Sequence, residues 1–133
     1  MTPREIDALV AEKVFNQPVE WVEVLDYQGK RKEPYLCESN EGYGSSDEVD
    51  HYSTSIADAW EVIPNVKYRS SFTGEYAMDP ITIAYQSHCN PNDFSRMVWT
   101  AHFRHSDSFA WSDTAPMAIC LAALKAVGVE VPE

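Results

Sequence analysis

The clearest hydrophobic pattern in the chain lies near its C-terminus and predicts a buried helix over about 114–127. Apolar residues occupy nearly every side of that helix, in one stripe of Met117, Leu121, Leu124 and Val127 and a second of Ala115, Ala118, Ala122 and Ala126. A helix that is apolar all round is buried, so we expect it to pack against a sheet. Asp113 as a capping residue, Pro116 in the first turn and Gly128 after the last turn mark its ends.

Two shorter amphipathic patterns predict further helices. Near the N-terminus, residues 2–5 have the layout of a capping box, and the apolar positions that follow at helical spacing up to Asn16 are Ile6, Leu9, Val10 and Val14. A second helix is expected within 52–64, capped by Ser53 or Thr54 and stopped by Pro64. Its predicted apolar face holds Ile56, Ala59, Trp60 and Ile63.

Segments rich in β-branched and aromatic residues predict strands at 19–27, 66–72, 81–86 and 97–104, the last two as an antiparallel hairpin. Residues 28–50 are polar and turn-rich, and we expect a long surface excursion there around a short strand at 35–37, with a small loop at 106–112. The predicted fold is a single α/β domain spanning 1–133. Its architecture is an α-β-α sandwich with a small, mainly antiparallel sheet covered by helices.

Charge and composition narrow the classes of partner. The 133 residues include 10 Lys and Arg against 21 Asp and Glu, a net charge of −11, which disfavours nonspecific binding to nucleic acid or to an anionic membrane. Mimicry of nucleic acid is a minor alternative, because the acidic residues are scattered among aromatic ones. No apolar run approaches the length of about 18 residues that a membrane span needs. The three cysteines, Cys37, Cys89 and Cys120, form no CxxC pair, so a reducing cytoplasm is expected.

Three blocks of sequence resemble a known family when taken together. They are MTPREIDALVAEKV at 1–14, YSTSIADAWEV at 52–62 and DTAPMAICLAALKA at 113–126, and in this order they resemble the phage ABA sandwich domain family of phage and prophage proteins. The resemblance implies a sheet with helices on its faces and a phage or prophage origin. With the reducing compartment expected from the cysteines, we predict that the protein acts in the host cell cytoplasm. It implies no activity and no catalytic residues. Segments 15–50 and 65–111 are longer and more aromatic than the family pattern, so a function particular to this protein is expected there.

Motifs of catalysis and metal binding are missing from the sequence. There is no GxSxG elbow, no HExxH and no Gly-rich phosphate loop with its lysine. The side chains of a conceivable metal site are scattered over separate segments without ligand spacing, namely His51, His88, Cys89, His102 and His105. We therefore expect a non-enzymatic protein with no catalytic residues, no metal and no cofactor.

The surplus of aromatic residues is the main pointer to function. Of seven Tyr and four Trp, the tyrosines together with Trp99 and Trp111 recur in or beside predicted loops. Aromatic faces next to guanidinium groups can stack a nucleobase and pair a phosphate. Arg104 is the last Lys or Arg before Lys125, so we predict a site where the 97–104 strand meets the last helix. The predicted ligand-binding residues are Trp99, Arg104, Trp111, Ser112 and Thr114. The alternative is that Trp60 and Trp99 belong to the core and the tyrosines cover the surface or an oligomer interface.

Three hypotheses about function follow. The first is a phage-encoded binding protein that captures a nucleotide-derived host immune signal and so blocks host defence. The second is an inhibitor or scaffold that acts through a protein–protein interface with Tyr and Trp as hot spots. The third is a hydrolase with an unrecognised motif. The partners expected are a nucleotide-like small molecule and a second copy in a homo-oligomer.

Overall fold

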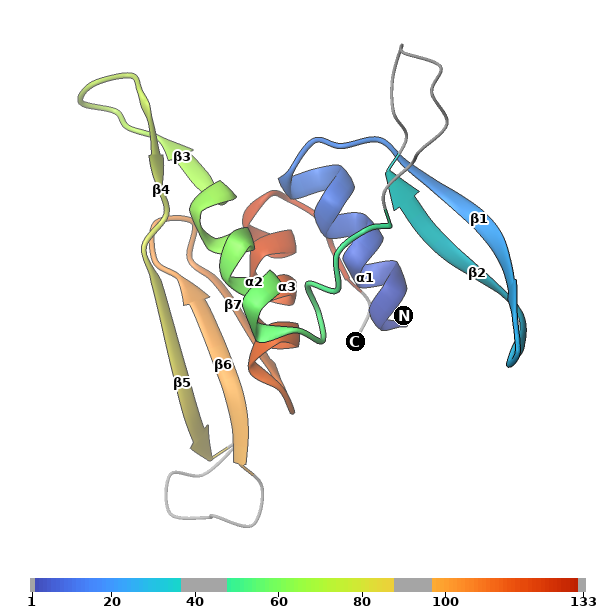
Figure 1. Ribbon diagram of the computed structural model, residues 1–133. Helices are drawn as coiled ribbons and strands as arrows, with labels where there is room; N and C mark the ends of the chain where they lie inside the picture. The colour runs from blue at the N-terminus through green and yellow to red at the C-terminus, as the bar shows by residue number, and fades with distance from the viewer. Residues whose placement is uncertain (1, 37–47, 88–96, 132–133) are drawn as a thin grey trace.

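The computed structural model of the protein describes residues 2–36, 48–87 and 97–131 (Figure 1). Its elements in chain order are α1 (Pro3–Leu9), the π-helix η1 (Val10–Val14), β1 (Val19–Asp26), β2 (Gly29–Leu36), α2 (Ile56–Val62), the 3-10 helix η2 (Ile63–Asn65), β3 (Lys67–Arg69), β4 (Tyr76–Met78), β5 (Ile81–Ser87), β6 (Met97–Phe103), β7 (Ser108–Ser112) and α3 (Ala115–Ala126). This mixture of helices and short strands confirms the predicted α/β class.

All of the strand pairing is antiparallel. β1 pairs with β2, β3 pairs with β4, and β5, β6 and β7 form a three-stranded sheet in that order, which confirms the predicted hairpin of the 81–86 and 97–104 strands. In Figure 1 the helices lie between the three-stranded sheet and the β1–β2 hairpin, which stand on opposite sides of the molecule. The predicted small antiparallel sheet with a helical cover is therefore present.

Helix α3 is the centre of the core. It contacts β6 and β7 as well as α1, η1 and α2. Its buried residues are Ala118, Ile119, Cys120, Ala122, Ala123 and Leu124. The predicted stripe needs correction, because Met117 and Leu121 are only partly buried and Val127 is exposed. Leu124 of that stripe is fully buried, together with Ile119 and three alanines, and alanine lets neighbouring elements approach the helix axis closely.

The ends of α3 explain its sharp boundaries. The N-cap is Thr114 rather than Asp113, and its side chain makes no capping hydrogen bond. At the C-terminal end, the Gly128 N–H donates to the Lys125 carbonyl at 3.0 Å and the Val129 N–H donates to the Leu124 carbonyl at 2.8 Å. Gly128 has a φ of +88°, so this end is a Schellman motif in the place where the sequence predicted a glycine stop.

The N-terminal helix begins as predicted. The Thr2 hydroxyl accepts from the Glu5 N–H at 3.3 Å, and the Glu5 carboxylate accepts from the Thr2 N–H at 3.4 Å, which completes the capping box. The helix then widens into η1 and ends before Asn16, whose φ of +55° turns the chain towards β1. Ile6, Val10 and Val14 are buried, in agreement with the predicted apolar face.

Two strands were predicted as loops. The charged segment 29–36 is β2, because a two-residue turn that leads into Gly29 at a φ of +109° folds it back on β1, where Glu23 faces Lys32 across the ladder. Residues 108–112 are β7, which continues the sheet beyond β6. Both strands are short or strongly charged, so neither shows a clear hydrophobic alternation. Residue 37 of the predicted 35–37 strand lies outside the described residues.

Helix α2 is shorter than predicted, and it buries a different face. Its cap is Ser55, not Ser53 or Thr54, and the predicted 66–72 strand is instead the short β3, paired with β4. Ala59, Val62 and Ile63 are buried, but Ile56 is 45% exposed and Trp60 is 54% exposed. The interpretation of Trp60 as a core residue was therefore wrong.

Arg4 connects three parts of the fold. Its guanidinium pairs with the buried Asp7 at 2.8 Å, with Glu33 of β2 at 3.0 Å and with Glu48 at 3.3 Å, and it also donates to the Val49 carbonyl at 2.8 Å. The Asp7 carboxylate also accepts the Ser53 N–H at 2.7 Å. These bonds hold the β1–β2 hairpin and the segment that leads into α2 against α1.

We predict that Leu124→Ala lowers the free energy of unfolding by about 2–5 kcal/mol, because Leu124 is fully buried and truncation leaves a cavity. Leu121→Ala on the same helix is the matched control and should cost about 1 kcal/mol, since that side chain is only partly buried. Urea denaturation measures both. An equal or larger loss for Leu121→Ala would contradict the burial described for α3.

We also predict that Arg4→Met lowers the free energy of unfolding by about 3–5 kcal/mol, because it leaves the buried Asp7 carboxylate without its cation. Lys30→Met removes an exposed ion pair with Glu23 at 3.8 Å and should change stability by less than about 0.5 kcal/mol. Thermal or urea melts compare the two. Similar losses for both variants would show that the Arg4 network does not anchor the fold.

Candidate functional site

A pocket of about 440 Å³ opens between α2, the three-stranded sheet and the start of α3. Its walls are mostly apolar and include two tryptophans from distant parts of the chain. The lining residues are Ile56, Trp60, Ile83, Trp99, Asp113, Thr114, Ala115 and Pro116. A concave apolar site with few polar groups is the usual form of a small-molecule site.

The fold explains how these side chains meet. Ile56 and Trp60 are four residues apart on α2, so they lie on the same face of that helix. Ile83 and Trp99 lie on the same face of the sheet, since Ile83 pairs with Ala101, two residues beyond Trp99. The ring of Trp99 also lies 5.0 Å from that of Tyr85, its cross-strand partner, in a tilted arrangement. Trp99 is therefore held in place from the side, while Trp60 is half exposed at the mouth.

The polar groups of the pocket come from the start of α3. The Thr114 side chain does not cap the helix, so the first-turn N–H groups lack the usual side-chain acceptor, and they carry the positive end of the helix dipole. Asp113 supplies a negative charge at the same place, and the lining contributed by the described residues contains no Lys or Arg. This balance favours a flat ring with few charges over a group with several negative charges.

Three of the five predicted ligand-binding residues come together here. Trp99 and Thr114 line the pocket, and Ser112 is the register partner of Trp99 across the β6–β7 ladder. The prediction that the site lies where this strand meets the last helix agrees with the geometry for these residues. Their role in binding stays a prediction.

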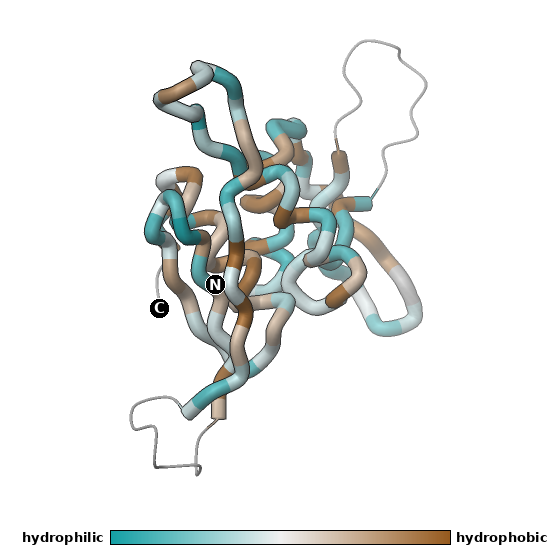
Figure 2. The backbone as a smooth tube through the Cα atoms, turned by 90° about the vertical axis from the view of Figure 1, so that its left-hand side faces the viewer, coloured by the Kyte–Doolittle hydropathy of each residue, from teal (hydrophilic) through white to brown (hydrophobic). Residues whose placement is uncertain are grey.

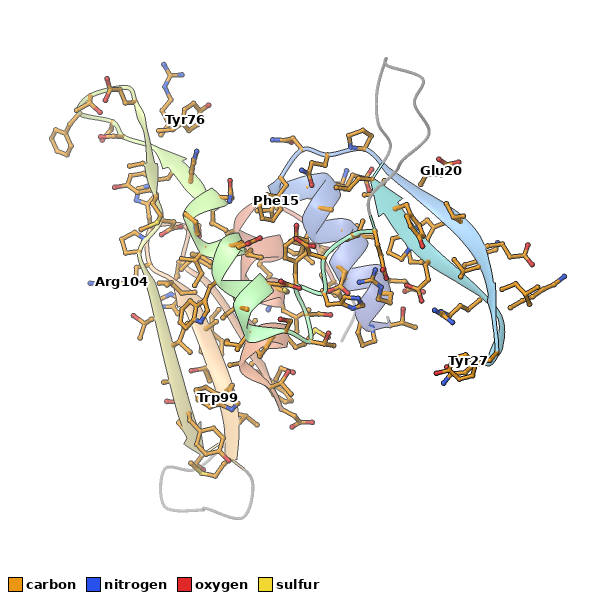
Figure 3. All side chains as sticks on the ribbon, viewed as in Figure 1. Phe15, Glu20, Tyr27, Tyr76, Trp99 and Arg104 are labelled. Carbon is orange, nitrogen blue, oxygen red and sulfur yellow. The ribbon has the colours of Figure 1, made fainter. Side chains whose placement is uncertain are left out.

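Trp111 and Arg104 lie elsewhere. Trp111 pairs with Thr100, so its side chain points to the opposite face of the sheet from Trp99. Arg104 follows the far end of β6, five residues and about 16 Å along the strand from Trp99 (Figure 3). The five residues thus do not form a single site, and Arg104 does not offset negative charge at the pocket.

Comparison of the chain with known proteins identifies its family. Residues 8–124, which include every residue of the pocket lining, match the model of the phage ABA sandwich domain. The chain belongs to the phage ABA sandwich domain family. The predicted resemblance is confirmed, and the protein is a phage protein of this family.

A solved structure with a similar fold supports this assignment. The 2.0 Å crystal structure of a phage protein from Bacillus cereus ATCC 14579 is 21% identical, with a TM-score of 0.58 over 99% of this chain and 93% of that one. Identity at this level shows a shared fold and carries no statement about activity. No curated protein matches the chain significantly.

In this phage ABA sandwich protein, sequence reasoning missed Ile56, Trp60 and Ile83 as pocket residues. The signal was present, because Ile56 and Trp60 have the i, i+4 spacing of a common helix face. That spacing was interpreted as a core face. In the structure, the face of α2 that carries Ala59 and Val62 turns inward instead. The sequence alone does not distinguish these two faces.

The histidines of the described segments are committed to separate contacts. His102 lies 2.8 Å from Asp107, the His105 ring stacks on Tyr68 at 3.7 Å, and His51 lies 3.1 Å from Arg4. Within residues 2–36, 48–87 and 97–131, no three His, Cys, Asp or Glu side chains converge as metal ligands. His88 and Cys89 lie outside these ranges, and the expectation of a metal-free protein stays a prediction.

Two further features bear on the predicted chemistry. Burial raises the pKa of the Cys120 thiol, so this core cysteine stays protonated and is a poor nucleophile. No helix within the described part of the chain is long and apolar enough to cross a membrane.

Proposed function

We propose that the protein acts by binding rather than by catalysis, and that it captures a small molecule with a flat aromatic ring. The ligand class we propose is a nucleotide-derived host immune signal, whose capture would block host defence. The observation that carries the proposal is the pocket lined by two tryptophans, Trp60 from α2 and Trp99 from β6. Its volume of about 440 Å³ falls within the usual range for small-ligand sites, about 300–1,000 Å³.

Aromatic stacking supplies affinity without chemistry. Each stacked base contributes about 1–3 kcal/mol, and the apolar side chains of Ile56 and Ile83 offer further area that a ring can bury. The polar side chains among the described lining residues are Asp113 and Thr114, without a His, Cys or Lys of the usual nucleophile–base pairs. The site therefore has the parts needed for capture.

Charge selects among nucleotide-like ligands. With Asp113 beside the pocket and a net charge of −11 on the chain, a triphosphate is repelled. The first-turn N–H groups of α3 can receive one polar or singly charged group. We therefore infer a ligand that places its base between the tryptophans and carries little net charge.

We predict that Trp60→Ala and Trp99→Ala each weaken ligand binding by about 1–3 kcal/mol, the contribution of one stacked ring. Trp21→Ala, on the β1–β2 hairpin, removes a tryptophan outside this pocket and is the matched control. Isothermal titration calorimetry against nucleosides, cyclic nucleotides, ADP-ribose derivatives and triphosphates provides the measurement, and thermal melts show that each variant is folded.

The same titrations test the position of the site. Arg104→Ala and Trp111→Ala should change affinity by less than about 0.5 kcal/mol, because neither side chain reaches the pocket. If no member of the panel binds the unmodified protein, or if Trp21→Ala weakens binding as much as Trp60→Ala, then the proposed pocket is not the binding site.

A second candidate function is inhibition or scaffolding through a protein interface. The observation that favours it is the pair of hairpins, β1–β2 and β3–β4, whose turns project beyond the helices in Figure 1. Tyr27 at the turn of the first is 94% exposed, and Phe72 at the turn of the second is 98% exposed. Figure 2 shows a hydrophobic stretch at the tip of the upper hairpin. Exposed aromatic residues on protruding loops are suited to insertion into a pocket of a partner.

We predict that Tyr27→Ser and Phe72→Ser leave ligand titrations unchanged, because both positions lie outside the pocket. Native mass spectrometry of the protein recovered from infected cells separates the two functions. A retained small mass that disappears in Trp60→Ala supports capture, whereas a retained polypeptide that disappears in Phe72→Ser or Tyr27→Ser supports the interface.

A further inference from the structure

Strand β5 is an edge of the three-stranded sheet over its full length, Ile81–Ser87. Its inner side pairs with β6, and no strand of the described segments pairs with its outer side. In Figure 1, β5 is the outermost strand on its side of the molecule. An edge strand of this length presents a row of backbone groups that can pair with another strand.

The register identifies which backbone groups point outward. The Arg104 N–H donates to the Pro80 carbonyl at 2.8 Å, so this opposed pair is hydrogen-bonded. Bonded and non-bonded pairs alternate along an antiparallel ladder, so Thr82, Ala84 and Gln86 bond to β6. Ile81, Ile83 and Tyr85 therefore direct their N–H and C=O groups away from β6, towards the free edge.

Other free edges of the fold carry the usual protection against pairing. β1 contains Glu20 and Glu23, and three consecutive basic residues, 30–32, lie in β2. β7, the opposite edge of the three-stranded sheet, has its Phe109 carbonyl covered by the Lys125 ammonium at 2.9 Å. Charged side chains and such covers keep edges from pairing. The segment ITIAYQS of β5 has no charged residue and no proline.

Exposed apolar side chains lie beside this unprotected edge. Tyr85 of β5 is 54% exposed, and it is on the same face of the sheet as Ile83 and Trp99. Ile56 and Trp60 of α2 lie over that face, because they share the pocket lining with Ile83 and Trp99. Main-chain groups for pairing and apolar side chains for packing thus occur together.

We propose that this edge pairs with β5 of a second copy of the same chain, antiparallel and about a two-fold axis. The two sheets then form one continuous sheet of six strands, and the α2 helices of the two copies lie on the same face of it. A two-fold arrangement matches the edge to itself, so that Ile83 and Tyr85 of one copy lie opposite the same pair in the other.

Where two copies meet, the charge of the chain favours contact through β5 over contact through the charged strands β1 and β2. A net charge of −11 makes two copies repel each other, and like charges placed opposite in a ladder are destabilising. Self-pairing of an uncharged strand brings no charges together. A partner held by charge would instead use the acidic surface, so increasing salt should strengthen this dimer and weaken such a complex.

The test compares two variants of equal charge by analytical ultracentrifugation at about 1–100 μM, the range of a moderate self-association. The unmodified chain should shift from one to two copies with concentration, with a lower dissociation constant in 0.5 M than in 0.05 M salt. Tyr85→Lys places a charge in the apolar patch and should raise that constant at least about tenfold. Gln86→Lys changes the next residue, which is also exposed but points to the opposite face, and should change it less than about threefold.

Hydrogen exchange of the same samples locates the contact. The amides of Ile81 and Ile83 should exchange at least about tenfold more slowly in the dimer than in the Tyr85→Lys monomer, as expected for newly paired edge groups. A chain that stays monomeric throughout, a dimer that Tyr85→Lys leaves intact, or a dimer without protection of β5 overturns the proposal. None of these measurements uses a ligand, so the outcome is independent of the proposed capture function.

Discussion

Close packing around α3 is the constraint on which the other elements depend. The helix contacts β6 and β7 as well as α1, η1 and α2, and three of its fully buried residues are alanines. Alanine allows short distances between backbones, while Ile119 and Leu124 fill the space between layers. Because the Schellman motif at Gly128 fixes one end of α3 and Pro116 the other, the first turn has a defined position above the sheet. That position brings Thr114 to the pocket.

The pocket is a consequence of how little α2 can bury. The helix has seven residues, and its inward positions are taken by Ala59 and Val62, which fit against α3. Its larger apolar residues, Ile56 and Trp60, are left at the surface over β5 and β6. Exposed apolar groups of this size cost solvation free energy unless something covers them. The ligand and the second copy that we propose each cover part of this surface.

Local signals in the sequence predicted what depends on neighbours along the chain. The capping box at Thr2, the glycine stop at Gly128 and the hairpin that holds Trp99 were all predictable in this way. β2 and β7 were not, because their pairing depends on β1 and β6 rather than on their own alternation. The same holds for the pocket. Thr114 and Trp99 lie at the predicted junction of strand and helix, whereas Trp111 lies on the other face of the sheet. Its position depends on the pairing register of β7 with β6, which the sequence does not specify.

The net charge of the chain determines which partners can approach these exposed surfaces. On a chain with 21 acidic and 10 basic residues, an uncharged strand and an apolar pocket are the places where a neutral ring or an identical molecule can approach without repulsion. Five of the ten basic residues are used elsewhere: Arg4 neutralises the buried Asp7, Lys125 covers the edge of β7, and three more lie together on β2. Among the described residues, the pocket lining contains no Lys or Arg to draw a polyanion to it. The distribution of charge thus separates capture of a weakly charged ligand from binding of nucleic acid, although both would use aromatic stacking.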